Sequence, residues 1–373
     1  MSRQEIGPVQ AVTPAGIIPG ASIEIEAGKI VSITADRTAS TRELPYALPA
    51  FIDPHIHGAG GFGPEQNTPE SLLQMSAVLA RQGVAAFCPT LYCAKPEQMA
   101  AQLRALLPAL GKETGAQIIG FHLEGPFISP HKPGVMKPQD MAPAHLDDFK
   151  KIYEAAQGHI AIVTLAPEIP GIDPIIDFCV RHHMVPQAGH TDATYEQMQA
   201  AFDKGVRRVT HWGNAMSGPH QRKPGVFTAA LDNPGISCEV IADGKHVHPA
   251  WLSVLHQLKP ISQISAVTDA LLPTGQAQGP FYANDEEVTL QEGVWKRKQD
   301  GVTAGSCLTM LEALRQLVQA GYTLPQAAAC TSTHTAQLLG LPPTLQPQSA
   351  ANLVLISPDL QKIEAVFLNG QSI

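Results

Sequence analysis

The chain has 373 residues, of which 44% are hydrophobic and 16% charged, and its formal net charge is −8. Such a composition is typical of a globular protein with a large core, organised as one barrel-sized domain or two ordinary ones. The negative charge and the absence of Lys- or Arg-rich runs argue against a nucleic-acid-binding protein. No apolar run is long enough to span a membrane, so we expect no membrane partner.

The six cysteines are scattered along the chain, and none forms a C-x-x-C pair. In a chain of this length the pattern indicates reduced thiols in an intracellular protein. The first residues lack the basic-then-apolar pattern of a signal peptide. We therefore expect a cytoplasmic location.

Both ends of the chain are rich in expected strands. Residues 22–26 and 30–33 flank a turn near the N-terminus, and residues 352–356 and 363–370 flank another near the C-terminus. We expect residues 1–48 and 347–373 to form one small β-sandwich domain together. Residues 49–346 would then be a larger domain inserted between its two parts.

Between these ends, strand-like apolar runs alternate with helical patterns, as in βα units with a parallel sheet. The runs predict eight strands, which end near His57, Thr90, Glu124, Ala166, His190, His211, Asp243 and Asp269. Helices are expected over residues 69–81, 96–110, 146–156, 174–183, 195–204, 249–258, 308–320 and 324–339. Eight units favour an α/β fold of the (β/α)₈ TIM-like barrel type over a doubly wound sheet.

The expected strand ends carry a set of nitrogen and oxygen ligands. In such barrels the chemistry lies at the C-terminal ends of the strands, and residues i and i+2 of a strand share a face. The set predicts a metal-binding mouth and consists of His55, His57, Glu124, His190, His211 and Asp269. Zinc suits these ligands best, with iron, cobalt or manganese as alternatives, and one or two ions per subunit.

Each of these residues also has a structural interpretation. The His55-x-His57 pair could be an ordinary polar strand end, Glu124 could be held in a buried salt bridge, and Asp269 could cap a helix. Together, however, Glu124, His190 and His211 make a three-ligand site with room for water, and a nearby carboxylate could take a proton from that water. His122 shares the face of Glu124 deeper in the barrel, so we expect it to be packed and hydrogen-bonded.

Anion binding has one weak candidate, Arg222 in the segment His220–Gly225, because arginine grips phosphate with two hydrogen bonds. Asp243 and His246 add a polar pair near the mouth. The glycine-rich segment 58–63 lacks the pattern of a phosphate-binding P-loop, so we interpret it as a flexible loop.

These motifs, taken in order, resemble the amidohydrolase superfamily and, within it, the N-acetylglucosamine-6-phosphate deacetylases, almost from end to end. The resemblance rests on residues 49–58, 122–127, 165–168, 189–190, 210–216, 241–246, 268–270 and 304–310. Hydantoinase- and dihydroorotase-like relatives use a carboxylated lysine from the fourth strand, which here ends without a lysine.

The resemblance implies roles for these residues. Glu124, His190 and His211 would hold the principal metal, and His55 and His57 match members in which Glu124 bridges a second ion. Asp269 would act as general base and then acid, with His246 stabilising the oxyanion. The implied sugar-phosphate site comprises Val135, Met136, Asn214, Ala215, Arg222, His246, Thr303, Ala304 and Gly305. In the family this site is completed across a homodimer interface, so Arg222 could serve the neighbouring subunit.

The implied activity is hydrolysis of the N-acetyl group of an amino-sugar 6-phosphate, the glucosamine derivative first, to acetate and the free amine. Met136 replaces a usual histidine, and Trp212-Gly213 replaces a usual apolar-aromatic pair; both are expected near the sugar. The alternatives are the N-acetylgalactosamine 6-phosphate epimer, a cyclic amide or an N-acyl-amino-acid as substrate. A catalytically idle sugar-phosphate-binding regulator is the alternative from another class.

Overall fold

Eight parallel strands form the centre of the computed structural model, which describes residues 3–35 and 43–373. Backbone hydrogen bonds from Asp269 N to His55 O and from His57 N to Ala270 O, each 2.9 Å, join the last strand to the first. The predicted (β/α)₈ barrel is therefore confirmed. Its strands are β5 (Phe51–Ile56), β6 (Val84–Leu91), β8 (Phe121–Glu124), β9 (Ile160–Leu165), β10 (Val185–Ala188), β11 (Arg208–Val209), β12 (Ser237–Ile241) and β13 (Ile264–Val267), with β7 (Gln117–Ile118) beside β6.

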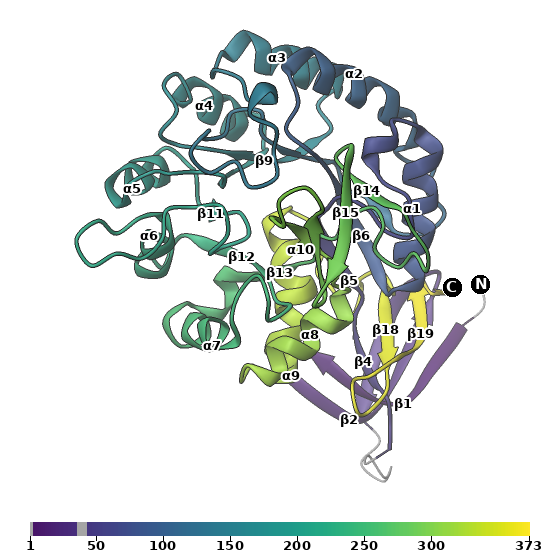
Figure 1. Cartoon of the computed structure of the whole chain (residues 1–373). Helices are drawn as coiled ribbons and strands as arrows, with labels where there is room; N and C mark the ends of the chain where they lie inside the picture. The colour runs from purple at the N-terminus through teal and green to yellow at the C-terminus, as the bar shows by residue number, and fades with distance from the viewer. Residues whose placement is uncertain (1–2, 36–42) are drawn as a thin grey trace.

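Helices surround this barrel on its outer side, as Figure 1 shows. They bury one face against the strands, which are themselves buried on both faces and therefore apolar along most of their length. Thr68 begins the first helix by accepting a hydrogen bond from Ser71 N, and a proline follows it at the first helical position. The helices are α1 (Pro69–Arg81), α2 (Pro96–Leu106), α3 (Leu146–Ala155), α4 (Asp173–Arg181), α5 (Tyr195–Asp203), α6 (Val226–Asp232), α7 (Pro249–Leu258), α8 (Met310–Gln319), α9 (Leu324–Ala328) and α10 (His334–Leu338).

Three features differ from the sequence prediction. The helix α6 was not predicted. Residues 324–339 do not form one α-helix, because a π-helical turn (Ala329–Thr333) separates α9 from α10 and Thr331 Oγ1 donates to Ala327 O at 3.0 Å. The chain after β13 also forms an unpredicted antiparallel sheet of four strands, β14 (Phe281–Ala283), β15 (Glu286–Gln291), β16 (Val294–Arg297) and β17 (Thr303–Ser306).

Both ends of the chain enter one seven-stranded sheet beside the barrel, where the purple and yellow strands of Figure 1 lie together. Ile30 N donates to Ser349 O at 3.0 Å and Ala351 N to Gly28 O at 2.8 Å, so the sheet curls back over its own apolar core. The domain boundaries at residues 48 and 346 remain predictions, and residues 1–2 and 36–42 lie outside the described part. The strands are β1 (Arg3–Thr13), β2 (Gly16–Glu26), β3 (Lys29–Ala35), β4 (Tyr46–Pro49), β18 (Leu353–Ile356), β19 (Ile363–Leu368) and β20 (Gln371–Ser372).

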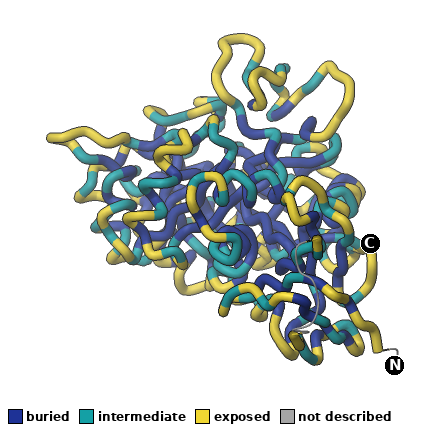
Figure 2. The backbone as a smooth tube through the Cα atoms, turned by 90° about the horizontal axis from the view of Figure 1, so that it is seen from below, coloured by how far each residue is buried: buried dark blue, intermediate teal, exposed yellow. Residues whose placement is uncertain are grey.

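The main core lies between the barrel strands and their helices. Figure 2 shows buried backbone through the middle of the molecule and exposed segments mostly in peripheral loops. Across residues 3–35 and 43–373, no helix combines the length and the hydropathy that a membrane span needs.

Candidate active site

The carboxylate of Glu124, at the end of β8, lies at the centre of the six candidate ligands. Its Oε1 is 3.1 Å from both His190 Nε2 and His211 Nε2, and those two nitrogens are 3.3 Å apart. Its Oε2 lies 3.2 Å from His57 Nε2. The two oxygens of one carboxylate thus face two different groups of ligands.

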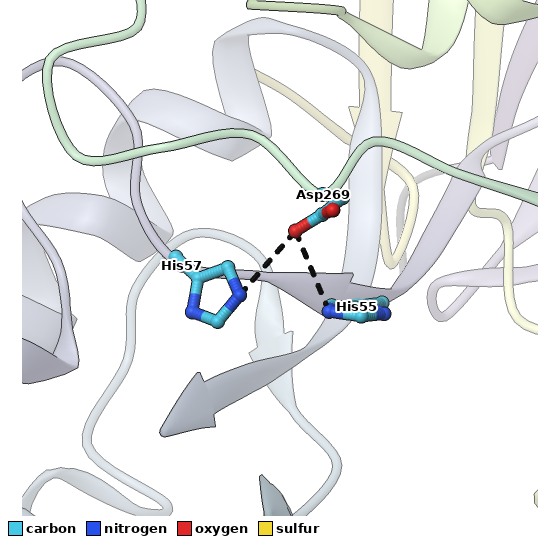
Figure 3. A group of neighbouring side chains, drawn as sticks. All are labelled: His55, His57 and Asp269. Carbon is cyan, nitrogen blue, oxygen red and sulfur yellow. Dashed lines mark ion pairs between the residues drawn. The ribbon is translucent and has the colours of Figure 1, made fainter. Parts of the chain in front are cut away.

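The second group joins the first and last barrel strands (Figure 3). Asp269 Oδ1 lies 3.3 Å from His57 Nε2 and 3.5 Å from His55 Nε2, the two contacts that Figure 3 marks with dashed lines. His55 Nε2 is also 3.6 Å from Glu124 Oε1. All six predicted ligands therefore converge on one point of the barrel mouth, in two groups of three that share the Glu124 carboxylate.

The spacing of these atoms fits a metal ion. A tetrahedral zinc ion that holds its nitrogen and oxygen ligands at about 2.0–2.1 Å keeps those ligands about 3.3 Å from one another. The atoms of the Glu124, His190 and His211 group have nearly this separation. His55 Nε2 is buried and has no hydrogen-bond partner among the described residues, although it faces two carboxylates. Both groups could accordingly hold a divalent cation.

Three of the six residues have a left-handed backbone, which is uncommon for residues other than glycine. The φ angles are 46° at His190, 29° at His211 and 49° at Asp269. Such conformations cost free energy and cluster at functional sites, where the surrounding structure holds them in place. Each one turns a side chain inward at the point where its strand ends.

Hydrogen bonds to the outer ring nitrogens fix how these imidazoles face the centre. His57 Nδ1 lies 3.1 Å from Thr90 O, and His190 Nδ1 lies 3.0 Å from Lys132 O. A carbonyl partner makes Nδ1 the protonated nitrogen, which leaves Nε2 free to bind a metal. The ring of Tyr92 stacks on His57 with the centroids 3.9 Å apart.

His55 has a different partner, which the sequence analysis did not identify. Its Nδ1 lies 2.6 Å from Glu239 Oε1, a carboxylate in the middle of β12. The sequence did contain a signal for the importance of Glu239, because it is a charged residue inside the otherwise largely apolar strand Ser237–Ile241.

His122 lies among hydroxyl groups and is absent from both candidate ligand groups. Its Nδ1 is 3.1 Å from Thr90 Oγ1 and its Nε2 is 2.8 Å from Thr164 Oγ1. Burial and the charge of His55 hold the pKa of His122 well below its usual value. The expectation of a packed, hydrogen-bonded histidine is confirmed.

The Asp269 carboxylate is ionised in this setting. Burial raises the pKa of Asp269, but the charge of His55 and the hydrogen bond from His57 outweigh burial and hold the pKa below its usual value. An ionised carboxylate at the metal groups is the form that a general base requires.

A cavity of about 140 Å³ opens directly above the ligand groups. Eight of the nine predicted sugar-phosphate residues line it: Val135, Met136, Asn214, Ala215, His246, Thr303, Ala304 and Gly305. His246 Nδ1 lies 2.5 Å from Asp243 Oδ2, so Nδ1 carries the proton and Nε2 is the ring's second polar atom. The pair that the sequence singled out at the end of β12 thus supplies one oriented imidazole to the cavity.

Two residues lie away from this cavity. Arg222 is exposed on the loop before α6 and is not among the lining residues. Trp212 is fully buried and stacks on Phe227 with the centroids 4.2 Å apart, and its Nε1 donates to Phe227 O at 3.2 Å. The expectation that Trp212 lies near the sugar is therefore not met, because its side chain packs against Phe227 and is not among the residues that line the cavity.

Comparisons with known proteins agree with this architecture. The model of the amidohydrolase family matches residues 46–373. An N-acetylgalactosamine-6-phosphate deacetylase of Escherichia coli O157:H7 is 30% identical, over 96% of each chain. An N-acetylglucosamine-6-phosphate deacetylase of Vibrio furnissii is 32% identical, over 87% of this chain and 82% of the other.

Solved structures extend the agreement to three dimensions. The N-acetyl-D-glucosamine-6-phosphate deacetylase of Mycobacterium smegmatis, a mutant in complex with N-acetyl-D-glucosamine-6-phosphate, superposes with a TM-score of 0.92 at 28% identity, over 100% of this chain and 99% of the other. The enzyme of the same name from Thermotoga maritima gives a TM-score of 0.90 at 28% identity, over 99% of both chains. The chain belongs to the amidohydrolase family.

Proposed function

We propose that this protein is a metal-dependent hydrolase that removes the N-acetyl group of N-acetyl-D-glucosamine 6-phosphate, giving D-glucosamine 6-phosphate and acetate. The observation that carries the proposal is the position of Asp269, a carboxylate that belongs to the ligand group of His55 and His57 and also lines the small cavity. Several relatives that cover most of the chain carry this activity in their names, which supports the same assignment.

A divalent ion held by Glu124, His190 and His211 would supply an electrophile for the amide carbonyl and lower the pKa of a water molecule. Asp269 accepts a proton from the water molecule that attacks the acetyl carbon, and then delivers the proton to the amine as the C–N bond breaks. Burial lowers the pKa of His246, but the hydrogen bond and the charge of Asp243 outweigh burial and raise it, which favours a ring with a proton on each nitrogen. Nδ1 donates to Asp243, and Nε2 donates a hydrogen bond to the oxygen that becomes negative. The products are acetate and the free amine.

We propose zinc as the ion, with iron, cobalt or manganese as alternatives, and one or two ions per subunit. The nitrogen-rich groups and their spacing support zinc. We also propose a cytoplasmic location, which the six free cysteines support.

The phosphate is proposed to bind at a homodimer interface, where Arg222 acts on the cavity of the neighbouring subunit. Arg222 is exposed and is not among the residues that line the cavity of its own chain, which supports a role across subunits. We expect Arg222→Ala to raise KM for the phosphorylated substrate at least tenfold, since charge-assisted hydrogen bonds to phosphate contribute about 1.5–3 kcal/mol each.

Steady-state kinetics on phosphorylated and unphosphorylated N-acetylglucosamine checks this prediction. Lys223→Ala, next to Arg222 on the same loop, is the matched control and should change KM much less. An unchanged KM in the Arg222 variant would remove this residue from the phosphate site.

One observation favours a second substrate, the galacto epimer: the Escherichia coli relative named for it covers 96% of both chains. The epimers differ at one hydroxyl, which one or two side chains of the cavity would distinguish. Met136 is the first candidate, because it lines the cavity and replaces the usual histidine.

Acetate release by the metal-loaded protein tests the proposal on both epimers. We expect faster release from N-acetylglucosamine 6-phosphate. A preference for the galacto epimer would keep the chemistry and change the substrate. No release from either compound would refute the deacetylase proposal and favour other N-acyl substrates or the idle regulator.

A further inference from the structure

Glu239 is a fully buried carboxylate in the middle of β12, below the two ligand groups. A buried negative charge is costly unless charged and polar partners compensate it. A charge inside a barrel strand therefore needs a specific set of partners, and the structure provides one.

Four donors surround this carboxylate. Glu239 Oε1 accepts from His55 Nδ1 at 2.6 Å and from the backbone N–H of His211 at 3.1 Å. Glu239 Oε2 accepts from Gln187 Nε2 at 3.3 Å and from Arg208 Nη2 at 3.5 Å. Arg208 is itself buried and supplies the compensating positive charge.

We infer that Glu239 is the positioning residue that makes His55 a metal ligand, and that it thereby enables the protein to hold a second ion. The inference rests on the proposed metal-dependent function and goes beyond it, because it assigns the second ion to a residue outside both ligand groups. By accepting a hydrogen bond from His55 Nδ1, Glu239 holds the ring with Nε2 directed toward Glu124 and Asp269, where it would bind the ion.

His57 and His190 use neutral backbone carbonyls for the same purpose. A carboxylate partner makes an imidazole more basic than a carbonyl partner does. Of these three histidines, His55 is therefore the one whose metal affinity depends most on another side chain. The bond to His211 N also ties Glu239 to the strand end of the other group. Glu239 thus contacts both groups, but it holds a ligand ring only in the group of His55; in the other group it bonds the backbone of His211 and not its ring.

Glu239→Gln is the informative substitution, because it keeps the size of the side chain. If the amide nitrogen of the new glutamine side chain faces His55, its N–H and the Nδ1–H of His55 are both donors and cannot bond to each other. The imidazole proton must then move from Nδ1 to Nε2. If the nitrogen faces Arg208, the guanidinium loses a charged acceptor and His55 keeps only a neutral one. Either orientation weakens His55 as a ligand.

The experiment titrates the metal-free full-length chain with Zn²⁺ and measures stoichiometry and affinity, with Co²⁺ absorption spectra as a second readout. The parent chain should bind two ions and His55→Ala one. Glu239→Gln should bind the first ion with near-parent affinity and the second roughly 10- to 100-fold more weakly. Glu239→Asp, which keeps the charge, should give an intermediate affinity and provides the test if Glu239→Gln does not fold.

Asp53→Asn is the matched control. Asp53 is an equally buried carboxylate on β5 that accepts from Thr268 Oγ1 at 2.6 Å and from the backbone N–H of His55 at 3.4 Å, but contacts no imidazole ring. This variant should bind both ions. Parent affinity for both ions in Glu239→Gln, a single ion in the parent chain, or equal loss in Asp53→Asn would each overturn the inference. Two ions without deacetylation would instead refute the proposed function alone.

Discussion

Replacing Asp269 with asparagine should lower kcat by about 10²- to 10⁴-fold, the range typical for loss of a general acid–base group. The amide has almost the shape of the carboxylate but cannot take the proton of the attacking water or return it to the leaving amine. The buried carboxylate is ionised and lines the cavity, so the proposed chemistry depends on this one side chain. Acetate release under saturating substrate measures the loss.

The same variant should still bind its substrate and still hold an ion at Glu124, His190 and His211, because Asp269 belongs to the other ligand group. Metal analysis and the substrate dissociation constant check both points. Asp192→Asn is the matched control: Asp192 is an exposed carboxylate 3.4 Å from Lys132 and lies outside the cavity lining. It should keep near-parent kcat. A kcat within a few-fold of the parent value in Asp269→Asn would disprove the assignment of the base.

The barrel and its six candidate ligands could be predicted because most of the strands are buried, largely apolar runs with polar residues at or just after their ends. For β5, for example, the run Phe51–Ile56 is wholly buried, and the following His57 reaches the barrel mouth. Parallel strands of a barrel bring all their C-terminal ends to one face. A linear list of strand ends is therefore also a list of spatial neighbours.

Glu239 could not be assigned in the same way, because its importance comes from pairing across strands. It is 184 residues from His55 in sequence, and it lies mid-strand rather than at a strand end. The strand order places β12 beside β11 and β13, and the ring of His55 reaches Glu239 only because the barrel closes. The sequence shows a charged residue in an apolar run, but not which side chain compensates it.

The four-stranded sheet was missed for another reason. Its strands are short and mix polar with apolar residues, so hydrophobic periodicity gives a weak signal. One of its turns could have been predicted from the residue types: Asn284 and Asp285 both have positive φ angles, 52° and 59°, as expected for a tight hairpin turn. The omission matters for the site, since β17 contributes Thr303, Ala304 and Gly305 to the cavity.

Glu124→Ala should have the broadest effect of any single substitution in the ligand groups, since the two oxygens of this carboxylate face both of them. We expect loss of metal from both groups and a fall in kcat/KM of about 10³-fold or more. The expected fall assumes that a bound ion stabilises the transition state by about 4 kcal/mol, which corresponds to about 10³-fold in rate. Metal analysis and acetate release measure the two effects.

A thermal readout separates this effect from misfolding. Zn²⁺ at 100 times its Kd should stabilise the parent chain by about 2.7 kcal/mol and raise its Tm, whereas the Tm of Glu124→Ala should not respond to Zn²⁺. Glu168→Ala is the control, because that carboxylate accepts from Thr191 Oγ1 at 2.6 Å and belongs to neither ligand group. Its Tm should rise with Zn²⁺ as in the parent. If Glu124→Ala kept both ions, the carboxylate would not be the link between the two groups, and the histidines with Asp269 would have to hold the metal alone.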